Sequence, residues 1–196
     1  MLWRLAPSVA VLVIFPFAST GAYDIQGWSW NYQANPIEKE FIICRTDAPA
    51  SAVQRIKEAA NKWSNGKLKF KFGPDKCLDD PSTTKPDGYS YISFTDFADN
   101  GETADTRARP ETIGSKRTVE CDIRFNRKKL WYDGTGTPVA AQTDLLSVAM
   151  HEFGHCIGLG DVPSGEVVMN KKLDPGKTRR ELAPDDRDGR KSIYGE

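Results

Sequence analysis

Residues 151–161 read His-Glu-Phe-Gly-His-Cys-Ile-Gly-Leu-Gly-Asp and contain both histidines of the 196-residue chain. If this run begins as a helix, His151 and His155 lie four residues apart on one face, and their imidazoles can hold a single metal ion. Glu152 is rotated by about 100° from His151, which places its carboxylate beside the open coordination position. There the carboxylate can take a proton from a water molecule.

Gly158 permits a positive-φ turn that ends this helix, and Asp161 then returns as an oxygen ligand. Two imidazole nitrogens, one carboxylate and an open fourth position are typical of a catalytic zinc site, because a structural site would fill that position with a protein ligand. The alternative is an amphipathic helix that contains His and Glu by chance. The added glycine and aspartate at fixed spacing favour the metal site. We therefore predict one zinc ion held by His151, His155 and Asp161, with Glu152 as the general base.

This run resembles the zinc signature of the metzincin peptidases, usually HExxHxxGxxH, with aspartate in place of the third histidine. Metzincins also have a methionine-containing turn beneath the metal. Met169 follows at a suitable distance, although a lone methionine is usually core filler. Residues 182–195 are similar to the last helix of matrixin catalytic domains, and residues 121–126 with Trp131 to the strand before the active-site helix. The resemblance covers nearly the whole chain from about Trp28.

The resemblance implies an α+β fold of the zincin type: a twisted mixed sheet with an antiparallel edge strand, an active-site helix and a C-terminal helix. It implies a zinc endopeptidase with Glu152 as base. A matrixin-like edge strand, expected around residues 103–109, would bind an extended peptide by adding a strand to the sheet; the alternative is a solvated loop. Two other functions remain open, a non-catalytic zinc-containing binding module and a zinc amidase acting on cell-wall peptides.

The sequence departs from the matrixin pattern in two places, and it also lacks a ligand found in other metzincin groups. It shows no pro-segment with a cysteine switch, so we expect an enzyme that is active without such a segment or is restrained by a separate inhibitor. No histidine remains for the structural zinc that matrixins often carry. Lys171, two residues after Met169, takes the place of the tyrosine ligand of astacins and serralysins.

Residues 1–22 read as a secretory signal peptide, with Arg4 as the charged start, residues 9–17 as the apolar run and residues 20–22 as a small-residue cleavage site. The apolar run is too short to span a bilayer; an uncleaved anchor is the alternative. Cleavage would leave one catalytic domain, residues 23–196. We expect a secreted protein, extracellular or periplasmic, without stable membrane insertion.

The four cysteines are predicted to form two disulfides, because export exposes them to an oxidising compartment. Alternation along residues 119–125 turns Cys121 toward the core. Cys156 lies on the helix that should pack on that face. We therefore pair Cys121 with Cys156 and, by elimination, Cys44 with Cys77. The alternative is that the cysteines are free thiols.

The net charge and the length of the chain indicate which kinds of partner the protein binds. The formal net charge is zero, which gives no indication of nucleic-acid binding, and the length after cleavage fits one compact domain. We expect a monomer that acts on a protein or peptide substrate. If Lys171 and Lys172 line the pocket beyond the scissile bond, they would favour acidic substrate side chains. The alternative is a solvated basic face formed by Lys171, Lys172, Lys177, Arg179 and Arg180.

A calcium site is a second metal-binding hypothesis. Four carboxylates could supply oxygen ligands but lack a recognisable calcium-binding pattern; they are Asp96, Asp99, Glu102 and Asp105.

Hydrophobic periodicity predicts the remaining elements. Residues 53–63 show helical spacing, with Asp47 as a candidate cap, Pro49 in the first turn and Gly66 at the end. Thr143 or Asp144 should cap the active-site helix. Strands are expected at residues 41–44, 68–72 and 89–94.

Overall fold

The computed structural model describes residues 23–30, 33–46, 48–74, 86–98 and 101–195. The predicted signal peptide, residues 1–22, lies outside this part of the chain. No helix within the described ranges is both long and apolar enough to cross a membrane.

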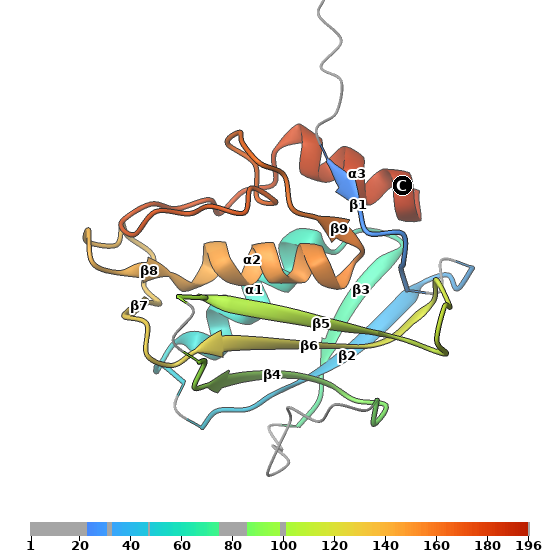
Figure 1. The fold of residues 1–196 in the computed structure, drawn as a ribbon, viewed down its shortest axis with the longest axis horizontal. Coiled ribbons are helices and arrows are strands. Elements are labelled where there is room, and N and C mark those ends of the chain that lie inside the picture. The colour runs from blue at the N-terminus through green and yellow to red at the C-terminus, as the bar shows by residue number, and fades with distance from the viewer. Residues whose placement is uncertain (1–22, 31–32, 47, 75–85, 99–100, 196) are drawn as a thin grey trace, which may run out of the picture.

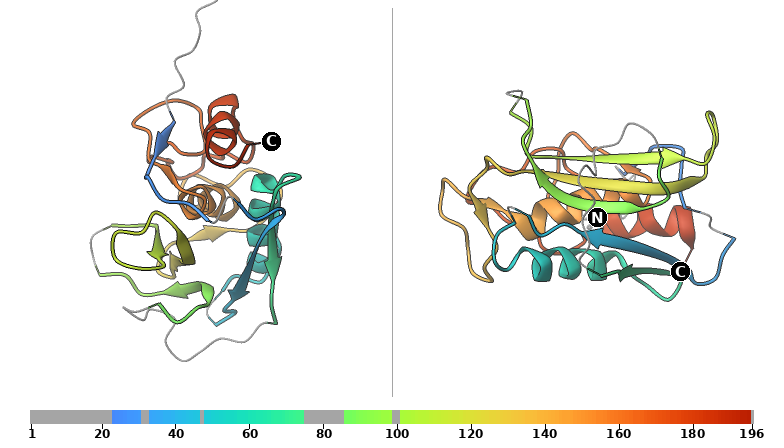
Figure 2. Two further views of the ribbon diagram at one scale, coloured as in Figure 1. Left: turned by 90° about the vertical axis from the view of Figure 1, so that its right-hand side faces the viewer. Right: turned by 90° about the horizontal axis from the view of Figure 1, so that it is seen from below.

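A five-stranded twisted sheet lies along one side of the molecule, with helices on one of its faces (Figures 1 and 2), and its strand order is β3-β2-β4-β6-β5. Strands β2, β3, β4 and β6 run parallel, whereas β5 runs antiparallel to β6 at the edge. The prediction of a mixed sheet with an antiparallel edge strand is thus confirmed, and the edge strand lies one residue from its expected range. The strands are β2 (Ile37–Ile43), β3 (Leu68–Phe72), β4 (Ser90–Thr95), β5 (Ala104–Pro110) and β6 (Thr118–Asn126).

Two helices fill the core beside the sheet. Helix α1 (Ala52–Trp63) packs against β3 and against α2 (Leu145–Cys156), which also contacts β5 and β6. The Trp63 indole donates to the carbonyl of Met150 at 2.7 Å and joins the two helices. The predicted apolar stripe of α1 is confirmed. Its predicted start is wrong, because the helix begins after Ser51 and Pro49 precedes it; the candidate cap Asp47 lies outside the described residues.

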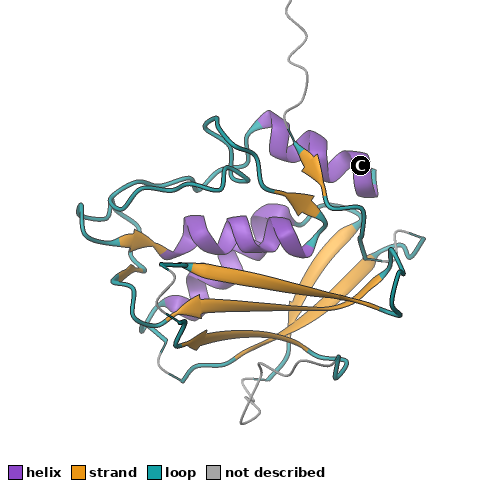
Figure 3. Ribbon diagram, viewed as in Figure 1, coloured by secondary structure: helices purple, strands orange, loops and turns teal. Residues whose placement is uncertain are grey.

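A third helix, α3 (Pro184–Tyr194), packs over the end of α2 (Figures 1 and 3). The Tyr194 hydroxyl donates to the Ile157 carbonyl at 2.8 Å, and this bond fixes α3 to the turn that follows α2. Two small sheets complete the fold: β1 (Asp24–Ile25) pairs antiparallel with β9 (Leu159–Gly160), and β7 (Trp131–Tyr132) pairs parallel with β8 (Thr143–Asp144).

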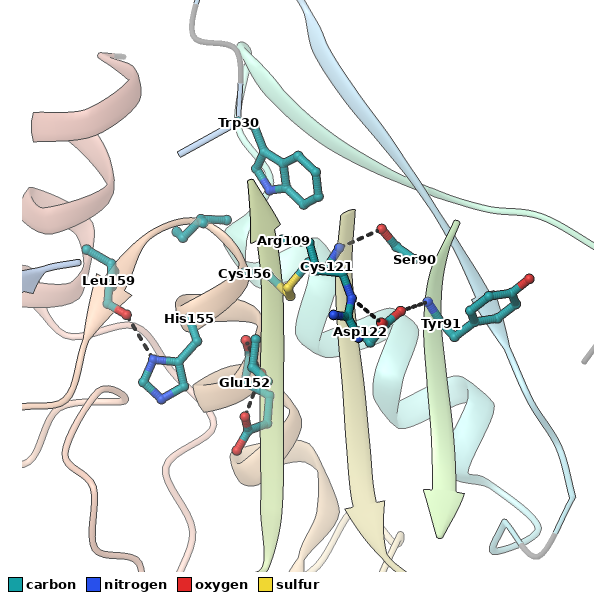
Figure 4. The surroundings of a disulfide bond; sticks show 12 residues. Trp30, Ser90, Tyr91, Arg109, Cys121, Asp122, Glu152, His155, Cys156 and Leu159 are labelled. Atoms are coloured by element: carbon teal, nitrogen blue, oxygen red, sulfur yellow. Dashed lines mark hydrogen bonds and ion pairs between the residues drawn. A yellow bond between two sulfur atoms is a disulfide. The ribbon is translucent and has the colours of Figure 1, made fainter. Parts of the chain in front are cut away.

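A disulfide between Cys121 and Cys156 joins β6 to the last residue of α2 (Figure 4). Both side chains are fully buried, and their Cα atoms are 5.7 Å apart. The predicted pairing is present, and it attaches α2 covalently to the sheet one residue after His155. The predicted Cys44–Cys77 pair involves Cys77, which lies outside the described residues, and stays a prediction.

We expect the double variant Cys121→Ala/Cys156→Ala to lose about 4 kcal/mol of unfolding free energy, the chain-entropy value for a closed loop of this size, since the two cysteines are 35 residues apart. Chemical denaturation of the parent and the variant measures this loss. Peptide mapping without reductant should recover residues 121 and 156 in one linked fragment. A fragment that links Cys44 to either of them would contradict the pairing.

Candidate metal centre

Helix α2 and the turn after it bring three ligand atoms together. The Nε2 atoms of His151 and His155 are 3.0 Å apart, and Oδ1 of Asp161 lies 3.1 Å and 3.4 Å from them. Within the described residues, these three form the one group of His, Cys, Asp or Glu side chains close enough to hold a metal ion, with all ligand atoms within 4.8 Å of one another. The residues that sequence spacing predicted as zinc ligands therefore converge in space.

Backbone carbonyls fix which nitrogen of each histidine faces the ligand position. Nδ1 of His151 lies 2.9 Å from the Val168 carbonyl, and Nδ1 of His155 lies 2.9 Å from the Leu159 carbonyl (Figure 4). Because a carbonyl only accepts, each Nδ1 carries a proton, and each Nε2 faces Asp161 and can bind a metal ion once it is deprotonated. This support is typical of zinc-binding histidines, so the donor set fits zinc.

Proton affinities at the metal-free site follow from its charges. Hydrogen bonds from His151 and His155 hold the pKa of the Asp161 carboxyl well below its ordinary range, against the opposing effect of partial burial. Burial lowers the pKa of His151, but its hydrogen bond to Asp161 and the nearby charge of Glu152 outweigh burial and raise that pKa. A proton and a metal ion compete for the same imidazole nitrogen, so zinc affinity should fall as the pH falls.

Gly158 makes the return of the chain possible. Its φ is +98°, and a Cβ at this position would lie 2.2 Å from the Trp28 carbonyl oxygen. Any other residue would be strained by the φ and would also clash with backbone. The turn leads into β9, where Leu159 supplies the carbonyl that orients His155, and Asp161 follows directly.

The turn that contains Met169 packs against helix α2 at Gly154. Met169 is buried, and a Cβ added at Gly154 of the helix would lie 2.1 Å from the Met169 sulfur. The buried Asp186 of α3 accepts from the backbone N–H groups of Val168 and Met169 at 2.9 Å and 3.1 Å. The position suits a methionine turn beneath a metal, and that role stays a prediction. Sequence reasoning missed Asp186, although it lies in the segment that resembles the matrixin C-terminal helix.

Glu152 lies at the wall of a cavity of about 570 Å³ that also contains the three ligand residues. Its side chain is buried, and Oε2 accepts a hydrogen bond of 2.6 Å from the Thr106 hydroxyl on β5. Residues 101–106 of the edge-strand region line the cavity, as do residues 170–173.

Asp144 caps α2 by accepting from the Ser147 N–H at 3.0 Å, as predicted.

The basic residues after the metal motif divide into two groups. Lys171 and Lys172 are exposed and line the cavity, as the sequence allowed. Arg179 also lines the cavity, but its guanidinium donates to the carbonyls of Asn170 and Lys172, and Arg180 forms an ion pair with the buried Asp144. The interpretation of these residues as a solvated basic face is therefore wrong for Arg179 and Arg180.

The candidate calcium ligands are partly engaged by arginines. Asp105 accepts from Arg124 Nε at 2.7 Å, and this pair joins β5 to β6. Asp96 accepts from Arg127 Nε at 2.9 Å. Asp99 lies outside the described residues, and calcium binding stays an untested prediction.

Comparison with known proteins agrees with this architecture. Residues 33–195 match the family profile described as Matrixin, and the chain therefore belongs to the matrixin family of peptidases. The α+β fold with its active-site and C-terminal helices is the fold that this family predicts.

Individual relatives match over shorter stretches. The chain is 38% identical over 74 residues to Metalloendoproteinase 1 of Glycine max and 38% identical over 86 residues to Matrix metalloproteinase-25 of Homo sapiens. It is 40% identical over 79 residues to Stromelysin-3 of Rattus norvegicus. These stretches cover 36%, 39% and 39% of this chain and 24%, 14% and 14% of the relatives, so the matched part spans about a quarter or less of their lengths.

Proposed function

We propose that this protein is a zinc-dependent endopeptidase with Glu152 as its general base. One observation carries the proposal: the ligand atoms of His151, His155 and Asp161 converge at a cavity, and Glu152, the residue after His151 on α2, lines the same cavity. The matrixin family and its metalloendoproteinase relatives support the same reaction class.

The mechanism assigns a role to each side chain. Bound zinc would supply a Lewis acid that lowers the pKa of a water molecule and polarises the scissile carbonyl. His151, His155 and Asp161 would hold the ion. Glu152 accepts the proton of the attacking water and later gives it to the leaving amine. No serine or cysteine nucleophile is required, because no covalent acyl-enzyme forms.

The edge strand β5 is the proposed binding site for substrate. Among the described strands it pairs only with β6, so its other edge is available to a peptide. An extended substrate would add a strand there through main-chain hydrogen bonds. Since residues 101–106 also line the cavity, a peptide bound on this edge would pass the ligand residues and Glu152.

Secretion is the proposed localisation. The signal-like residues 1–22 and the buried Cys121–Cys156 disulfide support it together, because disulfides persist in oxidising compartments.

A substrate panel tests the function against its alternatives. The purified protein with zinc should cleave internal bonds of denatured proteins, and a chelator should abolish cleavage until zinc is restored. Cleavage of cell-wall peptides alone would identify an amidase. Stoichiometric zinc binding without hydrolysis of any member would identify a binding module.

Substrate preference gives a further prediction from the cavity lining. Lys171 and Lys172 should favour an acidic side chain beyond the scissile bond by roughly 1.5-fold to fivefold over its amide, the range for exposed charge pairs. The variant Lys171→Ala/Lys172→Ala should lose this preference, whereas Lys177→Ala, outside the cavity lining, should keep it. Values of kcat/KM for paired Glu and Gln peptides measure the effect, and an equal preference in the parent would refute it.

A further inference from the structure

The carboxylate of Glu152 is held by a residue from a different element. Thr106 lies on β5 and pairs with Ile123 of β6, so the sheet ladder fixes its backbone. Its Oγ1 is 2.6 Å from Oε2 of Glu152 and 3.2 Å from the Glu152 carbonyl oxygen. A threonine hydroxyl has one proton to donate. The shorter contact, to the carboxylate, is the stronger bond.

We propose that Thr106 is a positioning residue for the general base, an inference that rests on the proposed peptidase function. The Thr106 hydroxyl donates its hydrogen bond to Oε2 of Glu152. Within the described part of the chain, Oε1 receives no hydrogen bond, so it is left to accept the proton of the attacking water. A threonine side chain is stiff at χ1, and a strand paired with its neighbour moves little. Both features would restrict the carboxylate to one rotamer.

The same strand would hold the substrate. Residues 104–110 of β5 are the proposed edge for an extended peptide, and Thr106 belongs to that strand. The scissile bond and the base would then be aligned by one rigid element, and the proton transfer would gain from fixed geometry. A purely structural role for the Thr106 hydroxyl would instead be limited to attaching β5 to α2.

Two substitutions separate these roles. Thr106→Val keeps the shape and strand preference but removes the hydroxyl, whereas Thr106→Ser keeps the hydroxyl. We expect Thr106→Val to lower kcat by about 10- to 100-fold, which is part of the loss expected when general base catalysis is removed entirely, with KM, zinc affinity and Tm unchanged. Thr106→Ser should stay within about threefold of the parent. The matched control is Thr112→Val, at an exposed position in the turn between β5 and β6.

The double variant Thr106→Val/Glu152→Gln provides an independent check. If Thr106 acts through Glu152, removing its hydroxyl should not reduce the residual rate of Glu152→Gln further. An additional tenfold loss there would overturn the proposal, as would a Thr106→Val enzyme with the parent's kcat. A loss that follows reduced zinc affinity or Tm would also overturn it.

Crystal structures of the zinc-bound parent and Thr106→Val provide a readout other than activity. We expect the Glu152 carboxylate to leave its single position in the variant. If the parent hydrolyses no peptide, the proposed function fails, and the structures alone decide the role of Thr106. A carboxylate that keeps the same position in the variant would overturn the proposal in that case too.

Discussion

Replacing Glu152 by glutamine should leave a folded protein that binds zinc normally but turns over its substrate about 10³- to 10⁵-fold more slowly. Glutamine has nearly the same volume, and its carbonyl oxygen can still accept from the Thr106 hydroxyl. It cannot take a proton from water. Because the buried glutamate would act in both water activation and amine protonation, the loss should reach or exceed the upper part of the usual range for a single proton-transfer group.

The measurement is kcat and KM on one denatured protein substrate, with zinc content determined on the same samples. Glu111→Gln is the matched control, because Glu111 lies in the β5–β6 turn and only pairs with the exposed Arg117. We expect this control to retain the parent's rate. A Glu152→Gln enzyme that cleaves as fast as the parent would remove the base from the mechanism.

The residues of the metal motif could be placed from sequence because their geometry is local. The positions of His151, Glu152 and His155 follow from helical periodicity alone, and Gly158 follows from the φ that the turn requires. The Cys121–Cys156 pair also followed from local patterns, since strand alternation and helix facing gave the same inward direction.

The contacts that sequence reasoning missed are all made between distant segments. Thr106 reaches Glu152 across 46 positions, and Asp186 supports the Met169 turn from 17 positions away. Threonine is common in strands, and a second aspartate at a helix start is an ordinary capping residue. Neither residue type indicates a partner until the sheet and helices are assembled.

The partners of charged residues were also not predictable from sequence. Arg180 reads as one of several basic residues, but it pairs with Asp144, whose side chain is fully buried and whose position caps α2. A buried carboxylate requires a partner, and this requirement appears only when burial is known. Hence the local chemistry of the site was predictable, whereas the groups that hold it in place were not.

Asp161→Ala should lose zinc affinity by more than about 100-fold, since even the outer partners of metal ligands are typically worth 10- to 100-fold. Asp161 would supply a direct ligand atom, and its Oδ1 lies within 3.4 Å of both histidine Nε2 atoms. Activity at limiting zinc should fall in parallel. Competition with a chelator measures the affinity. Asp188→Ala, an exposed carboxylate on α3, should bind zinc like the parent. Full zinc occupancy and activity in Asp161→Ala would exclude Asp161 from the site.

Asp161→His tests the charge of the ligand separately from its presence. The variant should retain zinc, since the sequence then reads HExxHxxGxxH, provided that the longer ring fits beyond Gly158. A neutral imidazole donates less negative charge than a carboxylate, so the ion should lower the pKa of the attacking water further. Because the water must lose a proton to react, a lower pKa moves the rising acidic limb of the pH–rate profile to lower pH. An unchanged or upward-shifted limb in a zinc-loaded variant would show that the charge of Asp161 does not set the reactivity of the water.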